Sequence, residues 1–147
     1  MDIPDPQPGL VIHYSYLWRD EQRRGLEEGR KDRPCAIVLA VKKAEGATRV
    51  VVAAITHTPP QPGTGAIAIP PVTAKRLGLD DVPKWIVTHE FNMFTWPGPD
   101  GRPAPGSNPA SIAYGHLPHA LTTKLIEQAR EHVRLRTGVT VERDEKP

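Results

Sequence analysis

The sequence predicts a mainly β fold with some α structure, a small twisted or barrel-like antiparallel sheet with one helix packed on it. Several short segments have the apolar runs or the alternation of β-strands, and turn residues separate them. Only the segment after Pro118 has the period of an amphipathic helix. Successive strands followed by a single helix are typical of a sheet that buries one face under that helix.

The first strand and the segment that follows it are predicted from alternation and charge. Residues 10–18 alternate well enough for a strand and include several aromatic side chains. Residues 19–32 are dense in charge and contain Gly25 and Gly29, which indicates a loop or a short frayed helix. We favour a mobile loop that leads into the next strand.

Two long apolar runs predict a central hairpin. Residues 33–41 and 50–58 are rich in Val, Ile and Ala, as buried strands are, and the turn at 42–49 joins them. We therefore expect the two strands to pair antiparallel. Arg33 begins the first strand and Thr56 stands near the end of the second, so both should lie at the same edge of the sheet.

Shorter elements follow between turn-rich stretches. Pro and Gly are frequent at 59–65 and 97–109, which predicts loops there. The elements expected around these loops are a strand at 66–69, a helical turn at 73–77 closed by Gly78, one or two strands over 84–92 and 93–96, and a strand at 111–117.

One amphipathic helix closes the predicted fold. Pro118 suits a first helical turn, and Gly138 can stop the segment. The apolar residues that recur every fourth position are Leu121, Leu125, Ala129 and Val133. This stripe is narrow, so the helix suits packing on a sheet better than binding to a membrane.

Length and composition favour one domain. The 147 residues can bury a core without disulfides, and we expect a core of about residues 8–136, an extended leader at 1–7 and a charged tail at 139–147. The single cysteine, Cys35, lies in an apolar run, where we expect a buried side chain and a reducing, cytoplasmic location. No apolar run approaches the ~20 residues that a membrane helix needs, and no signal-peptide pattern is present.

A series of short motifs occurs in a distinctive order. A Gly-led strand at 9–16 is followed by a Gly-x-Glu stretch at 25–27, by Lys31 and by Arg33-Pro34 at the start of an apolar strand. A second strand then ends in Ile55-Thr56, and a segment at 85–94, a further strand and a helix follow. Over roughly residues 8–133 this order resembles the PemK/MazF-like toxins of bacterial toxin-antitoxin systems.

The resemblance implies a fold, an activity and partners. The family's fold is a compact SH3-like barrel of the CcdB/MazF type that forms homodimers, and its RNA-cleaving members use no metal or other cofactor. The arginine and the threonine or serine of its two specific motifs fall on Arg33 and Thr56 here. Single-stranded RNA would be the substrate, and a cognate antitoxin protein would occupy the RNA groove.

Metal-free RNA cleavage places three demands on such a site. The 2′-hydroxyl of the substrate attacks the adjacent phosphorus, so the enzyme must align the attack, neutralise charge on the phosphoryl oxygens and move protons. Arg33 suits the second task because a guanidinium binds two oxygens and stays charged. Thr56 adds a hydroxyl donor. His57 is a further candidate for proton transfer, although strand alternation points it away from Thr56 unless the strand has already turned at Pro59.

Aromatic and basic side chains of the first strand and the segment after it could hold single-stranded RNA. The candidates are Tyr16, Trp18, Arg19, Arg23, Arg24, Arg30 and Lys31. Acidic residues interleave with them, so a solvated loop explains the charges nearly as well. Glu90 and Asn92 share a strand face and could shape a pocket for a base. The net charge of +2 permits a nucleic-acid partner without requiring one.

Other side chains have plainer interpretations. His89 and Glu90 face opposite ways on a strand and lack a third ligand at suitable spacing, so no metal site is expected. His116 and His119 flank the helix start and are expected to be structural. The aromatic residues expected in the core or at a subunit interface are Trp85, Phe91, Phe94 and Trp96.

Two function classes remain open from the sequence. The first is an endoribonuclease toxin that leaves 2′,3′-cyclic phosphate and 5′-hydroxyl ends. The second is a non-catalytic SH3-like module that binds protein or nucleic acid, as related gyrase-poisoning toxins do.

Overall fold

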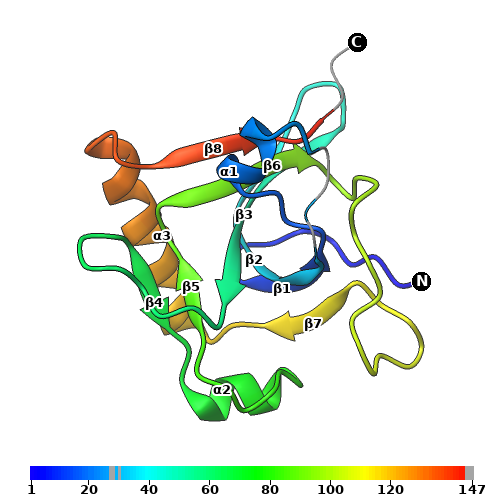
Figure 1. The fold of residues 1–147 in the computed structure, drawn as a ribbon. Coiled ribbons are helices and arrows are strands. Elements are labelled where there is room, and N and C mark those ends of the chain that lie inside the picture. Colours follow the sequence, from blue (N-terminus) through cyan, green and yellow to red (C-terminus); the bar gives the residue numbers. More distant parts are fainter. Residues whose placement is uncertain (27–28, 30, 145–147) are drawn as a thin grey trace.

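The computed structural model describes residues 1–144 except 27, 28 and 30. These residues form a mainly antiparallel sheet of eight strands and three helices (Figure 1). The strands are β1 (Leu10–Tyr14), β2 (Arg33–Lys42), β3 (Thr48–Thr56), β4 (Ala66–Ala68), β5 (Trp85–Val87), β6 (Glu90–Thr95), β7 (Ala113–His116) and β8 (Val139–Glu142). The helices are α1 (Arg19–Arg23), α2 (Pro71–Arg76) and α3 (His119–Arg134).

The β2–β3 hairpin organises the sheet. Its strands pair antiparallel as the two apolar runs predict, with a register irregularity between Ile37 and Leu39. The sheet continues from β2 through β1 to β7 on one side, and from β3 through β5 to β4 on the other. β3 also pairs with β6 over Arg49 to Val52, whereas its last residues, Ile55 and Thr56, pair with β5. The end of β3 is thus directed toward a separate pair of short strands.

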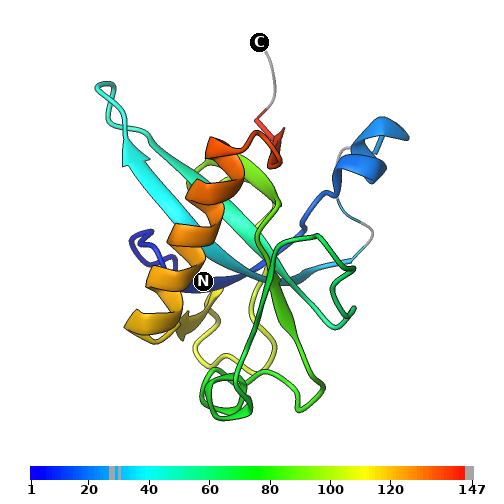
Figure 2. The same ribbon diagram turned by 90° about the vertical axis from the view of Figure 1, so that its left-hand side faces the viewer.

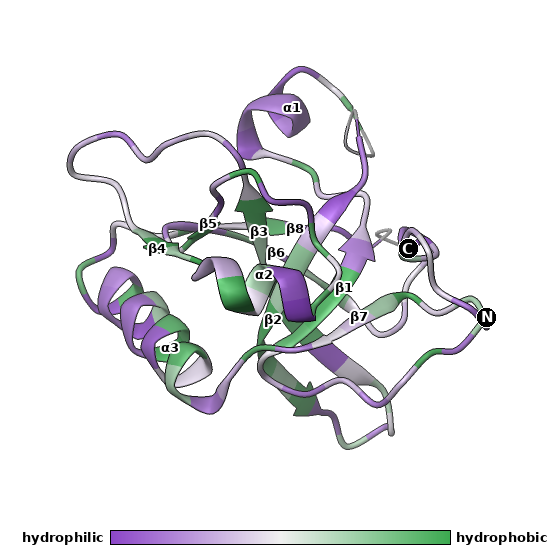
Figure 3. Cartoon of the chain, turned by 90° about the horizontal axis from the view of Figure 1, so that it is seen from below, coloured by the Kyte–Doolittle hydropathy of each residue, from purple (hydrophilic) through white to green (hydrophobic). Residues whose placement is uncertain are grey.

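Alternating side chains of the hairpin enter two apolar clusters. Ala36 and Val38 belong to the cluster that also contains Leu125 and Ala129 of α3. Figure 2 shows α3 lying in front of the strands that it covers. Cys35 and Ile37, on the other face of β2, join a second cluster rich in Tyr and Phe rings. Figure 3 shows the hydrophobic colouring of β3 and the hydrophilic colouring of α1.

The predicted helix and most predicted strands are confirmed. α3 occupies the segment where apolar residues recur, with Leu125 completely buried. Cys35 is buried as expected, and burial raises the pKa of its thiol, so the side chain acts as a small apolar group. None of the helices formed by the described residues has the length and apolar composition needed to cross a membrane.

The prediction of a charged tail at residues 139–147 is wrong for the described part of that segment. β8 pairs parallel with β6, from Glu90 beside Val139 to Met93 beside Glu142, and Val141 is buried. The alternating Val-Thr-Val of this strand has the period of a half-buried strand. Its neighbouring charged residues obscured that pattern in the sequence.

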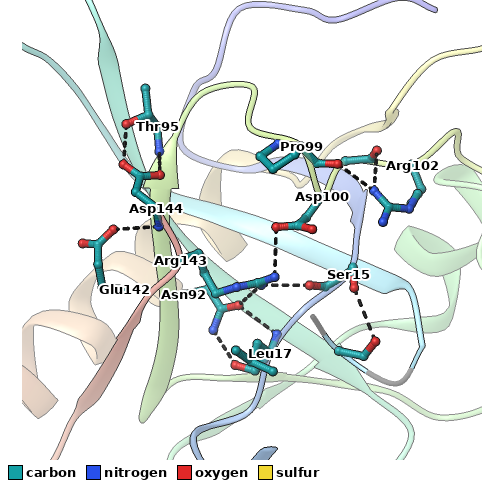
Figure 4. A network of polar contacts seen from close by, with 12 residues as sticks. Ser15, Leu17, Asn92, Thr95, Pro99, Asp100, Arg102, Glu142, Arg143 and Asp144 are labelled. Atoms are coloured by element: carbon teal, nitrogen blue, oxygen red, sulfur yellow. Dashed lines mark hydrogen bonds and ion pairs between the residues drawn. The ribbon is translucent and has the colours of Figure 1, made fainter. Parts of the chain in front are cut away.

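Those charged residues fix β8 to the rest of the sheet (Figure 4). The Arg143 side chain, only 1% exposed, donates hydrogen bonds of 2.8 Å to the Ser15 carbonyl and to Asn92 Oδ1. It also forms a 3.0 Å ion pair with Asp100, and its guanidinium lies 5.2 Å from the centre of the Tyr14 ring. Arg143 is therefore an interior residue, and its several polar partners compensate for burial of its charge.

A second group of polar contacts joins the start of β3 to the end of β8. Arg49 pairs with both Glu142 and Asp144, and the Thr95 backbone amide donates a 2.8 Å hydrogen bond to the Asp144 carboxylate. Thr95 lies opposite Arg49 in the β3–β6 pairing. The two acidic residues therefore complete a cluster that spans three strands.

The other differences concern the N-terminal third. The first strand ends at Tyr14, and residues 19–23 form the short helix α1 where a mobile loop was favoured. The Trp18 amide donates a 3.1 Å hydrogen bond to the Glu21 carboxylate, which caps this helix. The leader is anchored at Asp2, whose amide donates a 2.7 Å hydrogen bond to the Ala110 carbonyl.

Candidate functional site

A pocket of about 700 Å³ lies where β2 begins and β3 ends. This volume is in the range of small-molecule and cofactor sites. Its walls come from successive residues at the start of β2 and at the end of β3, from the loop after β3 and from β5. The chemically active lining residues include Arg33, Thr56, His57, Trp85, His89 and Tyr114.

Arg33 and Thr56 both line this pocket. The β2–β3 pairing ends with Cys35 opposite Ala54, and the same register continued by two residues would set Arg33 opposite Thr56. Side chains directly opposite in antiparallel strands project from the same face. Both residues are half-exposed and both line the pocket. The hairpin thus places both side chains on the lining of one pocket.

The row of side chains continues into the strands on either side. Tyr14 of β1 pairs with Arg33, and Trp85 of β5 pairs with Thr56. The Trp85 ring is half-exposed and lines the pocket, rather than being buried in the core. An aromatic surface therefore stands beside the hydroxyl of Thr56, on the side away from Arg33.

Among the described residues, the Arg33 guanidinium contacts an aromatic ring and no acidic side chain. Its central carbon lies 5.1 Å from the centre of the Trp18 ring, a cation–π distance. Its Nε atom is buried and has no hydrogen-bond partner among the described residues. A buried donor without a partner costs about 1–3 kcal/mol, so an anionic ligand that supplied an acceptor would be favoured.

The Thr56 hydroxyl has a defined orientation. Its oxygen accepts a 3.1 Å hydrogen bond from the Thr58 amide just beyond the strand. A hydroxyl that accepts one hydrogen bond still has its own proton to donate. The backbone after β3 therefore positions this group without using up its donor.

His57 reaches the pocket because β3 ends at Thr56. The pleat no longer fixes the direction of the next side chain, and both residues line the pocket. His57 Nε2 lies 3.4 Å from the Asp80 carboxylate. Asp80 also pairs with the buried Lys84, and the hydrogen bond from that lysine is the main cause that lowers the pKa of Asp80. The imidazole is exposed and belongs to this charged group at one side of the pocket.

Two residues predicted to contact RNA are instead buried, so those two predictions are wrong. Tyr16 is 0% exposed and donates a 3.0 Å hydrogen bond to Glu90. Asn92, also 0% exposed, accepts from the Leu17 amide at 2.9 Å and donates to the Leu17 carbonyl at 2.7 Å. Both side chains hold the chain beyond β1 against β6, an interior role that alternation in the sequence did not reveal.

Glu90 is half-buried beneath Tyr16 and is not among the pocket-lining residues. Burial raises the pKa of its carboxyl group, and the hydrogen bond from Tyr16 opposes that shift. Glu90 was predicted to shape a pocket for a base, but it does not line this pocket.

The basic candidates are divided between the pocket and α1. Trp18 and Lys31 line the pocket. Arg19, Arg23 and Arg24 are exposed on or next to α1 and lie outside the pocket lining, and the predicted contact Arg30 lies outside the described residues. Arg24 forms a 3.1 Å ion pair with Asp20, a surface contact of small energetic value.

The pocket residues that were not proposed from the sequence as site residues include Trp85, His89 and Tyr114. Trp85 lies there because the three-residue β5 pairs with the end of β3, and so short a strand carries no signal of its partner. His89 Nδ1 lies 3.1 Å from the Gly65 carbonyl, in the loop that forms another wall. The Tyr114 hydroxyl contacts His13, a residue of β1.

Across the described part of the chain, no group of three or more His, Cys, Asp or Glu side chains is arranged to hold a metal ion. No protein-family model matches this sequence, and comparison with curated proteins finds no match. The motif order of the sequence and the geometry of the pocket are therefore the features that indicate a function.

Proposed function

We propose that this protein is a metal-independent endoribonuclease, the toxin of a type II toxin-antitoxin pair, with the SH3-like barrel of the PemK/MazF-like family. The observation that supports this proposal is that Arg33 and Thr56 line one pocket, with the Arg33 Nε atom unpartnered among the described residues. A guanidinium beside a hydroxyl is suited to bind a phosphodiester and the charge that develops on it.

The reaction follows from these groups. The 2′-oxygen of one nucleotide attacks the adjacent phosphorus, and the bond from phosphorus to the 5′-oxygen breaks. Arg33 binds two phosphoryl oxygens and neutralises their growing charge, while Thr56 donates its hydroxyl proton to one of them. The products carry a 2′,3′-cyclic phosphate and a 5′-hydroxyl.

The pocket walls are suited to an unpaired nucleotide. Trp18 and Trp85 offer ring faces on either side of the Arg33–Thr56 pair, and Lys31 adds a positive charge. Bases that are free of a duplex stack on such rings, so single-stranded RNA is the proposed substrate. A homodimer, a cognate antitoxin that covers this pocket and a cytoplasmic location are part of the same proposal.

The test is cleavage of a long RNA by the purified protein in the presence of EDTA. Fragments with 5′-hydroxyl ends are expected, and Arg33→Ala should lower the cleavage rate by at least about 100-fold. Arg130→Ala, which removes an exposed arginine of α3 outside the pocket lining, is the matched control and should cleave normally.

Circular dichroism must show that the Arg33 variant is folded. Intact RNA after incubation with folded wild-type protein would overturn the nuclease proposal. Binding of RNA or protein without cleavage would then favour the non-catalytic binding module.

A further inference from the structure

A hydrogen-bonded tyrosine–histidine pair spans the wall of the pocket. The Tyr114 hydroxyl lies 2.7 Å from Nδ1 of His13, and the two rings meet edge to face with centroids 5.7 Å apart. Tyr114 lines the pocket and His13 lies behind it, half-buried. His13 is next to Pro34 in the β1–β2 pairing, one residue from Arg33.

An irregularity in strand pairing places Tyr114 there. Val11 pairs with Gly115 and the next residue, Ile12, pairs with Ala113, so Tyr114 is an extra residue in β7. Such a bulge redirects a side chain out of the regular pleat, and bulges are common beside active sites. The local backbone is thus shaped to bring this phenol to His13 and to the pocket.

The surroundings favour one protonation state for each member. Burial lowers the pKa of His13, the nearby Arg102 lowers it further, and Asp32 raises it. Burial, Cys35 and Asp32 together raise the pKa of Tyr114 to about 12. Near neutral pH the phenol therefore keeps its proton, and in the tautomer that leaves His13 Nδ1 unprotonated it donates a hydrogen bond to that nitrogen.

Neither Arg33 nor Thr56 is suited to accept a proton, and His57, the other candidate for proton transfer on this pocket, lies beside the Asp80 carboxylate. Arg33 stays protonated at any working pH, so it is a poor base, and Thr56 is a donor. RNA cleavage requires that the 2′-hydroxyl lose its proton as it attacks. With His13 Nδ1 unprotonated, the Tyr114–His13 pair is a chain of two groups that begins on the pocket surface and ends on a nitrogen able to accept a proton.

We propose that Tyr114 and His13 are the proton-accepting relay of the RNA-cleaving pocket, with Tyr114 as a catalytic residue and His13 as the final acceptor. This inference rests on the proposed nuclease function. The Tyr114 oxygen takes the proton of the 2′-hydroxyl while the phenol proton passes to His13 Nδ1, which leaves an imidazolium and a neutral phenol.

The remaining steps balance charge and protons. The 2′-oxygen forms its bond to phosphorus, and the 5′-oxygen leaves with the electron pair of the broken bond. The leaving oxygen takes a proton from water, and the hydroxide that remains removes the proton from His13. The pair returns to its starting state without any redox change.

The test measures single-turnover cleavage of a long RNA in EDTA from pH 4.5 to pH 8. Wild-type cleavage should rise with pH as His13 loses its proton, at a pH below the ordinary histidine value of about 6.5. Tyr114→Phe keeps the ring and removes only the hydroxyl, so it should slow cleavage by at least about 100-fold and abolish this rise. His13→Asn should do the same.

His119→Asn is the control, since this exposed histidine of α3 lies outside the pocket lining. Should Arg33→Ala abolish cleavage while folded Tyr114→Phe retains the wild-type rate and pH profile, the relay is overturned and the nuclease stands. Should folded wild-type protein leave RNA intact, the nuclease proposal and the relay both fail.

Discussion

The Arg33 side chain combines a charge, a planar shape and an aromatic support. Its guanidinium lies over Trp18, and its buried Nε atom has no hydrogen-bond partner among the described residues. Lysine would keep the charge but lose the planar fork and most of the stacking on Trp18.

Arg33→Lys is therefore expected to lower kcat/KM for RNA by about 100-fold, equivalent to roughly 3 kcal/mol of transition-state stabilisation. Arg130→Lys should leave the kinetics unchanged. Near-normal cleavage by Arg33→Lys would show that charge alone is enough and would contradict bidentate binding of the phosphate.

Glu90 gives a second prediction at the scale of one residue. Because burial raises the pKa of this carboxyl group, the folded state binds more protons than the unfolded state between the two pKa values. The contribution of Glu90 to the free energy of unfolding therefore falls as the pH rises between these two pKa values.

Glu90→Gln removes this titration while keeping an oxygen that can accept from Tyr16. The stability of the variant relative to wild type should rise between pH 4 and pH 7, as measured by urea denaturation. A difference that stays constant over this pH range would show that burial of Glu90 has no such effect.

At the scale of elements, length and periodicity decide what a sequence reveals. The β2–β3 hairpin and α3 were predicted because each contains many residues with one pattern. β8 was missed because four residues followed by charges look like a tail. Only the fold shows that Arg143 and Asp144 are partners of residues remote in the chain.

The amphipathic pattern of α3 leads to a stability prediction. Leu125, on the buried face of α3, is 0% exposed, whereas Leu135, just after the helix, is 53% exposed. Leu125→Ala should lower the free energy of unfolding by about 3 kcal/mol, through lost burial and the cavity left behind. Leu135→Ala should change it by less than about 0.5 kcal/mol, and equal effects in urea denaturation would contradict the packing described.

At the scale of the whole molecule, the candidate site is predictable only where it depends on the hairpin. The Arg33–Thr56 pair follows from two long strands joined by a short turn. Trp85 and Tyr114 reach the same pocket through a three-residue strand and a bulge, features set by packing among distant segments. Tyr16 and Asn92 were predicted to contact RNA, but both are buried. The reason is that the chain beyond β1 stays buried after the strand has ended.

Arg143 links several of these distant segments, and its removal should be costly. Arg143→Ala loses hydrogen bonds to Ser15 and Asn92 and the ion pair with Asp100, so we expect a loss of about 3 kcal/mol of stability. Arg134→Ala breaks the exposed ion pair with Glu131 and should have a much smaller effect. Thermal unfolding of the two variants makes the comparison, and similar values would contradict a structural role for Arg143.

The attachment of β8 has a kinetic consequence. The Arg143 contact with Ser15 joins positions 128 residues apart, so this part of the sheet assembles only after residue 143 has been synthesised. Contacts of such long sequence separation form slowly, because a large loop must close before they stabilise the fold. During synthesis on the ribosome, a nascent chain would carry the complete β2–β3 hairpin, and with it Arg33 and Thr56, before β8 can pair with β6.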